Sequence, residues 1–366
     1  MISIRLGKVL EIIDQREGCT EVKVMVDDRV ERAINYDSLT GPVAEGDDVY
    51  LNITAVQLGL GTGGYHFVMA NCSRREWEES SPGHIMKLRY TPMQLKVLAV
   101  EEEASPHRQQ IEEFDSLFST PVVIGTLHSM LPPAAAAIKA AGNFNLKVVY
   151  VMTDGAALPL AFSKLVAQLT QHKLIDGTVT VGHAFGGDLE AVNIYTGLIA
   201  AKRVLKADII IVSMGPGIVG TGTRWGFTGI EQGEIINATF VLGGSPVAIP
   251  RISFTDPRKR HYGLSHHTIV SLARVALRPA EVPLPEEMDD WKREYLDQQI
   301  KSNKLHLKHR FTVVRGREGL ELLKRFGIKV TSMGRTVEDD PDFFLAAAAA
   351  GLRATQLVEM SSNELG

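Results

Sequence analysis

Hydrophobic and polar residues alternate through the first 72 residues of the chain. Alternation with a period of two is typical of β-strands that bury one face, and glycine-containing turns separate the alternating stretches. Short strands joined in this way favour a barrel or a sandwich. We therefore predict a small all-β barrel or sandwich domain over residues 1–80. The alternating stretches are residues 2–13, 20–26, 29–36, 49–56 and 65–71.

The pattern changes near residue 90. The segment Thr91-Pro92-Met93-Gln94 has the residue types of a helix start, with a capping Thr followed by Pro. Beyond it, short runs of apolar, largely β-branched residues alternate with Ala- and Leu-rich helical patterns. Runs that are apolar throughout are typical of parallel strands covered by helices on both faces, which predicts a Rossmann-like, mainly parallel α/β domain over residues 90–366. The runs are residues 121–129, 146–156, 177–188, 207–217 and 247–254.

The last part of the chain begins with a change of composition. Residues 278–290, RPAEVPLPEEMDD, are rich in Pro and acidic residues and predict a linker. An amphipathic helix over 286–302, the apolar stretches 311–316 and 327–332, and a final helix from Asp340-Pro341 then predict an extension of helices and strands.

Composition narrows the class of protein. The chain has 366 residues, 45% of them hydrophobic and 22% charged, which is ordinary for a globular protein of two domains. A formal net charge of −4 argues against nucleic acid as a partner. With two cysteines, no signal-peptide pattern and no apolar run of membrane-spanning length, we expect a cytoplasmic protein that does not enter a membrane. Assembly with further copies of the chain is left open.

Five segments of the sequence resemble an uncharacterised bacterial family that is classed as a domain of unknown function. The resemblance covers most of the chain and implies a bacterial cytosolic protein, but it implies no activity and no catalytic residue. The segments are LGLGTGGYHFV at 58–68, RYTPMQLKVLAVEE at 89–102, GHAFGGD at 182–188, GPGIVGTGTRWGFTG at 215–229 and GLSHHT at 263–268.

Candidate chemistry gathers where the predicted parallel strands end. Because ligands of such sheets bind outside the carboxyl ends of the strands, we expect four side chains to share that rim and to act as catalytic groups. Imidazoles and carboxylates can transfer protons or hold a divalent metal ion. Simpler roles compete, since the two aspartates fit a helix cap and a turn, and the two histidines could be buried and hydrogen-bonded. The four are His128, Asp154, His183 and Asp188.

A glycine-rich loop follows the apolar run at 207–217. Gly215, Gly217 and Gly220 have the spacing G-x-G-x-x-G, but the chain continues TGTRWGFTG rather than opening a helix within the glycines, so a dinucleotide site is disfavoured. The next helix start is expected at Thr228, with Glu231 completing a capping box. A long loop of this composition predicts an anion site built from backbone N–H groups, hydroxyls and one arginine. A flexible connector is the alternative.

A third group of polar residues lies in 251–268, RISFTDPRKRHYGLSHHT. Ser265 fits a helix cap, which places His266 and His267 in the first turn, where they could bind phosphate or carboxylate or act as a base. The run at 258–260 fits a solvated group of charges. Together with the loop, this group gives the predicted substrate-binding set Gly215, Gly217, Gly220, Thr221, Thr223, Arg224, Arg251, His266 and His267.

Two functions are compatible with these residues. One is an enzyme that acts on a small anionic metabolite, which could be phosphorylated, at the carboxyl rim of the sheet. Its cofactor is left open, with a divalent metal as one option. The other is a metabolite-binding or regulatory protein that uses the same loops without catalysis. An enzyme needs a base within hydrogen-bond reach of the ligand, whereas a regulator needs only donors and a movable part.

Overall fold

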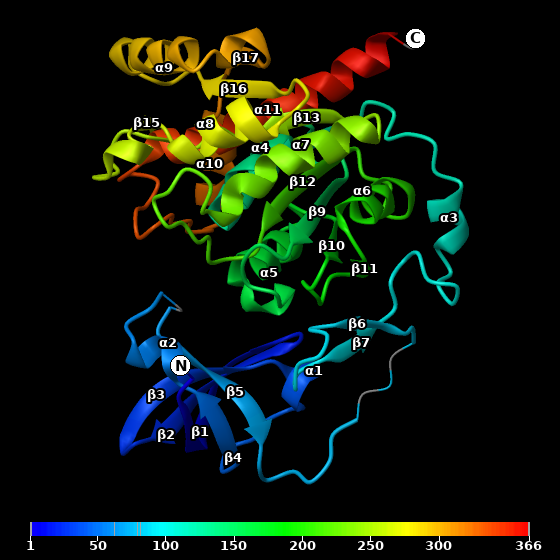
Figure 1. Cartoon of the computed structure of the whole chain (residues 1–366), viewed down its shortest axis with the longest axis vertical. Helices are drawn as coiled ribbons and strands as arrows, with labels where there is room; N and C mark the ends of the chain where they lie inside the picture. Colours follow the sequence, from blue (N-terminus) through cyan, green and yellow to red (C-terminus); the bar gives the residue numbers. More distant parts are fainter. Residues whose placement is uncertain (1, 62, 79, 81, 365–366) are drawn as a thin grey trace. The chain divides into compact units, whose positions relative to one another are not determined.

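The computed structural model describes residues 2–61, 63–78, 80 and 82–364 (Figure 1). The chain divides into two compact units, Met1–Leu98 and Ala99–Gly366. Each unit has its own hydrophobic core and is described by itself.

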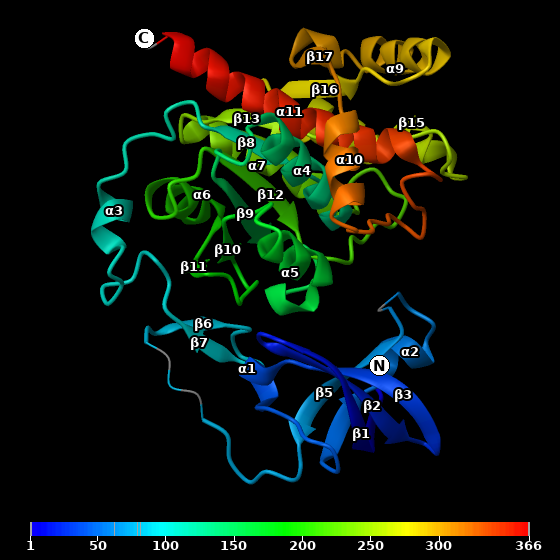
Figure 2. The same ribbon diagram turned by 180° about the vertical axis from the view of Figure 1, so that it is seen from behind.

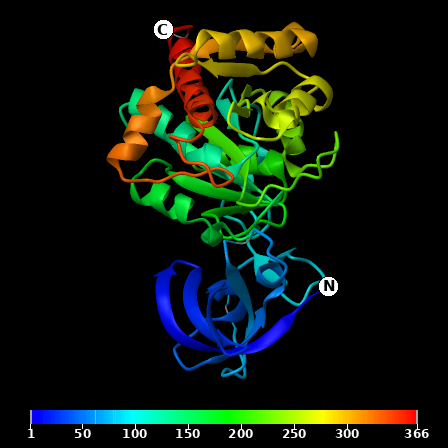
Figure 3. The ribbon, with the colours of Figure 1, turned by 90° about the vertical axis from the view of Figure 1, so that its left-hand side faces the viewer.

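The first unit is a five-stranded closed barrel, which confirms the all-β prediction. The strands follow the order β1-β2-β3-β5-β4, with β3 and β5 parallel and the remaining neighbours antiparallel. Figure 3 shows the curvature of these strands in blue. OB-folds are barrels of this strand number. The elements are β1 (Ile4–Arg16), β2 (Cys19–Val26), β3 (Arg29–Asn35), β4 (Asp48–Asn52) and β5 (Tyr65–Asn71), with short helices α1 (Asp37–Thr40) and α2 (Thr54–Gln57).

The barrel core follows from the alternation in the sequence. In β2, Val22, Val24 and Val26 point inward, and Val49 and Leu51 in β4 meet them. These side chains are almost fully buried, so each contributes about 1.5–3 kcal/mol through removal of apolar surface from water.

The helix predicted at Thr91 is wrong. Residues 85–97 form a hairpin of β6 (Ile85–Lys87) and β7 (Leu95–Val97). The Thr91 hydroxyl donates to the carbonyl of Leu88 and accepts the N–H of Met93, so the capping residue types close a turn instead of a helix.

The second unit contains an eight-stranded sheet in which every pairing is parallel, as predicted. Its order is β11-β10-β9-β12-β8-β13-β16-β17. β12 lies between the first two strands in sequence, β8 and β9, which differs from the dinucleotide-binding order in which those strands are neighbours. The strands are β8 (Pro121–Ile124), β9 (Val148–Thr153), β10 (Gly177–Val181), β11 (Leu189–Ala191), β12 (Ile209–Met214), β13 (Ser245–Ala248), β16 (Glu281–Pro285) and β17 (Arg310–Val314).

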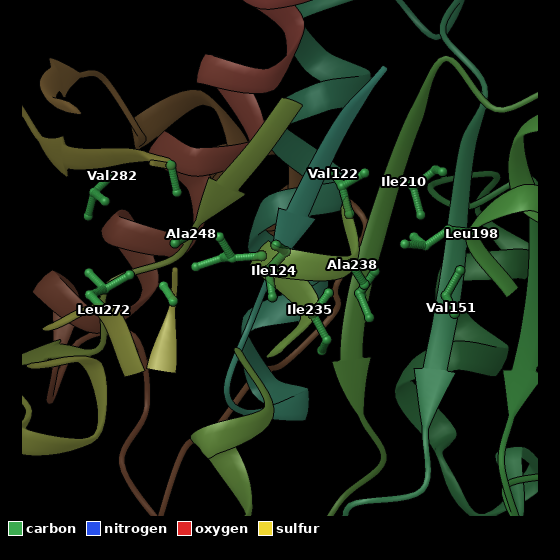
Figure 4. Packing of buried hydrophobic residues seen from close by; sticks show 14 of the residues in the cluster. Val122, Ile124, Val151, Leu198, Ile210, Ile235, Ala238, Ala248, Leu272 and Val282 are labelled. Carbon is green, nitrogen blue, oxygen red and sulfur yellow. The ribbon is translucent and has the colours of Figure 1, made fainter. Parts of the chain in front are cut away.

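Helices cover both faces of this sheet. Alternate residues of the central strands, such as Val151 and Ile210, pack against Leu198 of α6 and Ile235 of α7 (Figure 4). The intervening residues pack on the opposite face, which Figure 2 shows beneath α4 and α11. The helices are α3 (Arg108–Glu112), α4 (Leu131–Ala141), α5 (Lys164–Gln171), α6 (Ile194–Arg203), α7 (Glu231–Val241), α8 (His266–Val270), α9 (Asp290–Ser302), α10 (Arg317–Arg325) and α11 (Pro341–Glu364).

Short elements complete the second unit. The two-residue strands β14 (Ile252–Ser253) and β15 (Gly263–Leu264) pair with each other. The remaining turns are the 3-10 helices η1 (His128–Met130), η2 (Leu160–Phe162), η3 (Thr228–Ile230), η4 (Lys259–His261) and η6 (Leu305–Leu307), and the π-helix η5 (Ser271–Val275).

Two predictions about the last part of the chain need correction. Residues 281–285, inside the expected linker, form β16 and pair with β17. The stretch 327–332 forms no strand apart from an isolated bridge between Ser332 and Arg335, although Ile328 and Val330 are buried. Among the described residues, no helix combines the length and apolar character needed to cross a lipid bilayer.

Candidate functional site

His128 begins η1, shortly after the end of β8 at Ile124, and is buried in the protein interior. Its Nε2 is 2.6 Å from the Ser163 hydroxyl, and its Nδ1 is 3.3 Å from the hydroxyl of Tyr150. Burial lowers the pKa of His128 to about 4. Both ring nitrogens therefore have protein partners. This fits the simpler of the two roles considered for this residue, that of a buried, hydrogen-bonded histidine.

Asp154 and His183 end neighbouring strands and meet through the backbone. The Asp154 Oδ2 accepts the N–H of His183 at 2.9 Å. Close by, the hydroxyl of Thr153 donates to Glu231 Oε1 at 2.8 Å. Burial, with a contribution from Asp154, raises the pKa of Glu231 to about 7. The sequence prediction missed Glu231 as a titrating group and assigned it to a capping box; it begins α7 instead.

Asp188 does not join these residues. It lies just before β11, where its Oδ2 accepts the N–H and the hydroxyl of Thr178 at 2.8 and 3.0 Å. Thr178 is near the start of β10, so Asp188 lies at the amino end of the strands, opposite to His183. The helix that it was expected to cap begins at Ile194, and Asn193 caps it.

The glycine-rich loop is folded back on itself. Gly220 pairs with Phe227, and the Thr221 N–H donates to the Gly226 carbonyl at 2.8 Å. The hydroxyls of Thr221 and Thr223 are 2.9 Å apart, and Thr223 Oγ1 accepts the Gly226 N–H. These hydroxyls hold the loop together rather than facing a ligand.

One cavity joins this loop to the segment after β13. Its volume is about 110 Å³, and both walls come from the carboxyl side of the sheet, after β12 and after β13. We call it the arginine–histidine pocket. Its lining residues are Ile218, Val219, Gly220, Gly222, Arg251, Arg258, Arg260, His261, His267 and Met333.

Arg251 is the buried cation of this pocket, with 4% of its surface exposed. Its backbone N–H donates to the Thr268 hydroxyl, which fixes its position. Within the part of the chain that the structure describes, its guanidinium has two polar contacts, both long: 3.4 Å to His267 Nδ1 and 3.9 Å to Asp256 Oδ2. Burial, together with Arg258, lowers the pKa of Arg251 to about 10, so it is charged at neutral pH.

Asp256 holds the neighbouring arginines in place. Its carboxylate accepts two bonds from the Arg258 guanidinium, at 2.9 and 2.7 Å, and one from Arg335 at 3.2 Å. Burial opposes ionisation, but the bonds from Arg258 outweigh it and lower the pKa of Asp256. Arg335 also donates to Asp340. The run 258–260 is therefore partly structural: Arg258 is tied to a buried acid, whereas Lys259 and Arg260 are exposed.

Three histidines gather beside Arg251. His261, His266 and His267 each offer a ring nitrogen, and these atoms lie within 4.8 Å of one another. Phe227 stacks on His267 with ring centroids 4.0 Å apart. Burial, followed by the charge of Arg251, lowers the pKa of His261 to about 3 and also lowers that of His267. Burial also lowers the pKa of His266, so the neutral form is favoured for all three imidazoles.

The structure brings together only part of the predicted substrate-binding set. Gly220, Arg251 and His267 line the pocket. Gly215 is buried and Gly217 is exposed outside it, and Arg224 lines a separate cavity with Arg274, Lys304 and Lys308. Sequence reasoning did not single out Arg335, because no local pattern relates it to Asp256, which lies 79 residues earlier.

The family model described as "Protein of unknown function (DUF3866)" matches residues 32–351, most of the chain. The chain belongs to this family. The match confirms the resemblance seen in the sequence, and it extends from the barrel across the boundary at Leu98 into the α/β unit. A comparison with the curated proteins gives no match.

Proposed function

We propose that the protein acts on a small anionic metabolite, carrying a phosphate or a carboxylate, that it binds in the arginine–histidine pocket. The observation that supports this most is Arg251, a buried guanidinium that lines the pocket and has only long contacts to polar groups of the described residues. A buried charge without close partners is costly, and an anion that accepts two of its N–H bonds offsets that cost.

The charge balance around the pocket supports the same ligand class. Arg251, Arg258, Arg260 and Arg335 lie in or next to it, whereas the ion-pair partners of these arginines among the described residues are Asp256 and Asp340. The surplus is positive although the whole chain has a formal net charge of −4. An anion in the pocket is therefore attracted locally.

Catalysis is favoured over simple binding by the imidazoles at this pocket. An arginine cluster alone is enough to retain an anion, whereas histidines add groups that transfer protons or hold metal ions. The alternative, a regulatory protein that binds the same metabolite without changing it, uses the same arginines. The two differ in turnover, not in binding.

The test begins with binding. Thermal unfolding of the full chain is measured with phosphate, pyrophosphate, nucleotides and dicarboxylates. We expect at least one class to stabilise the protein by mass action, by about 2.7 kcal/mol at a concentration one hundred times its dissociation constant. Arg260→Ala removes an exposed pocket cation and should weaken that anion roughly tenfold.

Two further variants locate the binding site. Arg278→Ala removes an arginine that lies over the Phe240 ring and does not line the pocket, and it should leave the response unchanged. Arg224→Ala tests the separate basic cavity. A response that is lost with Arg224→Ala and kept with Arg260→Ala moves the site there and contradicts the proposal, as does the absence of any response. Mass spectrometry of the stabilising metabolites, incubated with the protein, then separates turnover from binding alone.

A further inference from the structure

The three histidines beside the pocket form a set of ligands as well as a set of bases. His261 ends η4, and His266 and His267 are the first two residues of α8. Ring centroids are 5.0 Å apart for His261 and His266, 4.9 Å for His261 and His267, and 4.3 Å for His266 and His267. Each ring thus approaches both others, although only two of the three are adjacent in sequence.

Local contacts orient two of these rings. His261 Nδ1 is 2.7 Å from the Ser265 hydroxyl, which leaves Nε2 of this ring for a ligand bond. Stacking on Phe227 fixes the plane of His267, and its Nε2 faces the glycine-rich loop, since a Cβ at Gly220 would lie 3.3 Å from that atom. Metal-binding histidines commonly use one nitrogen for the metal and the other for an orienting hydrogen bond.

His266 is difficult to explain as a packing residue. Both of its ring nitrogens are shielded from solvent and lack hydrogen-bond partners within the described part of the chain. The carbonyls of Arg260 and Thr223 lie near the ring without reaching hydrogen-bond geometry. Leaving a buried polar atom unsatisfied destabilises the folded protein. A bound ion would remove that cost for one nitrogen.

We propose that His261, His266 and His267 bind one divalent transition-metal ion, of which Zn²⁺ is the natural first candidate. Neutral imidazole suits this class of ion, and three protein ligands leave a fourth position open. Bond lengths of about 2.0–2.1 Å in tetrahedral geometry require nitrogens about 3.3 Å apart. Ring rotations that bring the nitrogens closer by up to about 1.5 Å close the present spacing of up to 4.8 Å to that value.

Arg251 determines the conditions under which the ion binds. A metal bond to His267 Nε2 places the ring proton on Nδ1, so Arg251 must give up its 3.4 Å contact there and move toward Asp256. A divalent cation next to this guanidinium is repelled by it. An anion that occupies the fourth metal position and also accepts from Arg251 offsets the repulsion. Metal and anion should therefore strengthen each other's binding. The factor by which the anion raises the metal affinity equals the factor by which the metal raises the anion affinity.

This coupling rests on the proposed function, whereas the metal site itself does not. The open position would let the ion polarise a phosphoryl or carbonyl oxygen of the bound anion, or activate a bound water. The reaction class that fits is metal-assisted hydrolysis or transfer at an anionic substrate.

The site is tested by metal titration of the purified full chain after removal of bound metal with a chelator. Calorimetry with Zn²⁺ should give one ion per chain, and Co²⁺ should give the intense visible absorption of a tetrahedral site. His266→Gln and His267→Gln should each weaken binding at least tenfold. His306→Gln, which changes an exposed histidine outside the cluster, should not. Circular dichroism and urea unfolding confirm that each variant is folded.

The outcomes separate the two proposals. No stoichiometric binding by the wild type, or binding that survives both His266→Gln and His267→Gln, overturns the metal site. Repeating the titration with sulfate, which does not precipitate these ions, should raise the metal affinity several-fold in the wild type, and Arg260→Ala should need a roughly tenfold higher sulfate concentration for the same gain. Anion stabilisation of the chelated protein without metal binding keeps the proposed function and removes the metal site. Metal binding that no anion affects keeps the site and removes the coupling.

Discussion

Glu231 and Gly182 lie on the same carboxyl edge of the sheet. At Glu231 the part-buried side chain affects local stability, and at Gly182 the lack of a side chain does so. Glu231 is part-buried at the start of α7, where the Thr153 hydroxyl is its donor. Gly182 has a φ of 65°, and a Cβ there would lie 2.3 Å from Asp154 Oδ2. The sequence marks glycine and acidic residues at strand ends, but burial and close approach depend on neighbours from other strands. Local patterns therefore located this edge and did not identify Glu231.

Glu231 should make the stability of the second unit depend on pH. Its pKa rises from 4.5 to about 7 on folding, so the folded state binds more protons between these values. The free energy of unfolding therefore falls as pH rises from 4.5 to 7, by an amount on the order of 2 kcal/mol. Glu231→Gln keeps the acceptor for Thr153 and should flatten this part of the profile in urea unfolding. A profile that is identical in the two proteins would show that Glu231 is not the group responsible.

Gly182→Ala should destabilise the protein through two effects. A left-handed backbone costs about 1 kcal/mol for alanine, and the new Cβ displaces Asp154 from its bond to the His183 N–H. The control is Gly327→Ala, whose φ is 70° but whose Cβ would meet nothing within 4 Å. In denaturant unfolding the loss for Gly182→Ala should exceed the control by at least 1 kcal/mol. Equal losses of stability in the two variants would show that the left-handed backbone accounts for the whole effect and that displacement of Asp154 costs nothing.

At the scale of elements, the buried parallel strands were predictable and the end of the sheet was not. Runs such as 207–217 are apolar on both faces, which few other structures tolerate. β16 contains Pro283 and Pro285, and proline disfavours inner strands. The sheet accommodates these prolines because β13 pairs with β16 at a single position, Val247 with Glu281, and both prolines lie beyond that contact. A linker and this strand have the same composition, and only the neighbouring strands distinguish them.

The segments 254–261 and 331–340 are joined by charge, which makes Asp256 a test of their assembly. Asp256→Asn leaves Arg251, Arg258 and Arg335 without their shared counter-ion and should lower the free energy of unfolding by about 2–4 kcal/mol. Sulfate should recover part of the loss, because an anion replaces the missing charge. Asp297→Asn on the exposed side of α9 should change little. A loss that sulfate does not reduce would argue against surplus positive charge at the pocket.

At the scale of the whole molecule, each unit encloses a core of its own. The barrel core contains Leu51 and Val24, and the sheet of the second unit is packed separately on both faces. The alternation of the first 72 residues and the apolar runs that follow them made this division visible in the sequence. The pocket lies wholly in the second unit, in loops whose convergence depends on the strand order β12-β8-β13. That order has no local signature, so only some of the predicted binding residues share a cavity.

Separate cores predict separable stability, which hydrogen exchange can measure. Leu51→Ala creates a cavity in the barrel and should cost about 2–5 kcal/mol there. Amide protection should fall in β1 to β5 and stay unchanged in β9 and β12, because local opening follows cooperative units. Ile211→Ala, in the centre of β12, should do the reverse. An anion that binds the pocket should raise protection in the second unit of both variants, since the residues that line the pocket belong to that unit. Loss of protection in both units from either substitution would mean that the chain unfolds as one cooperative body, and the stabilisation by an anion would then extend to the barrel as well.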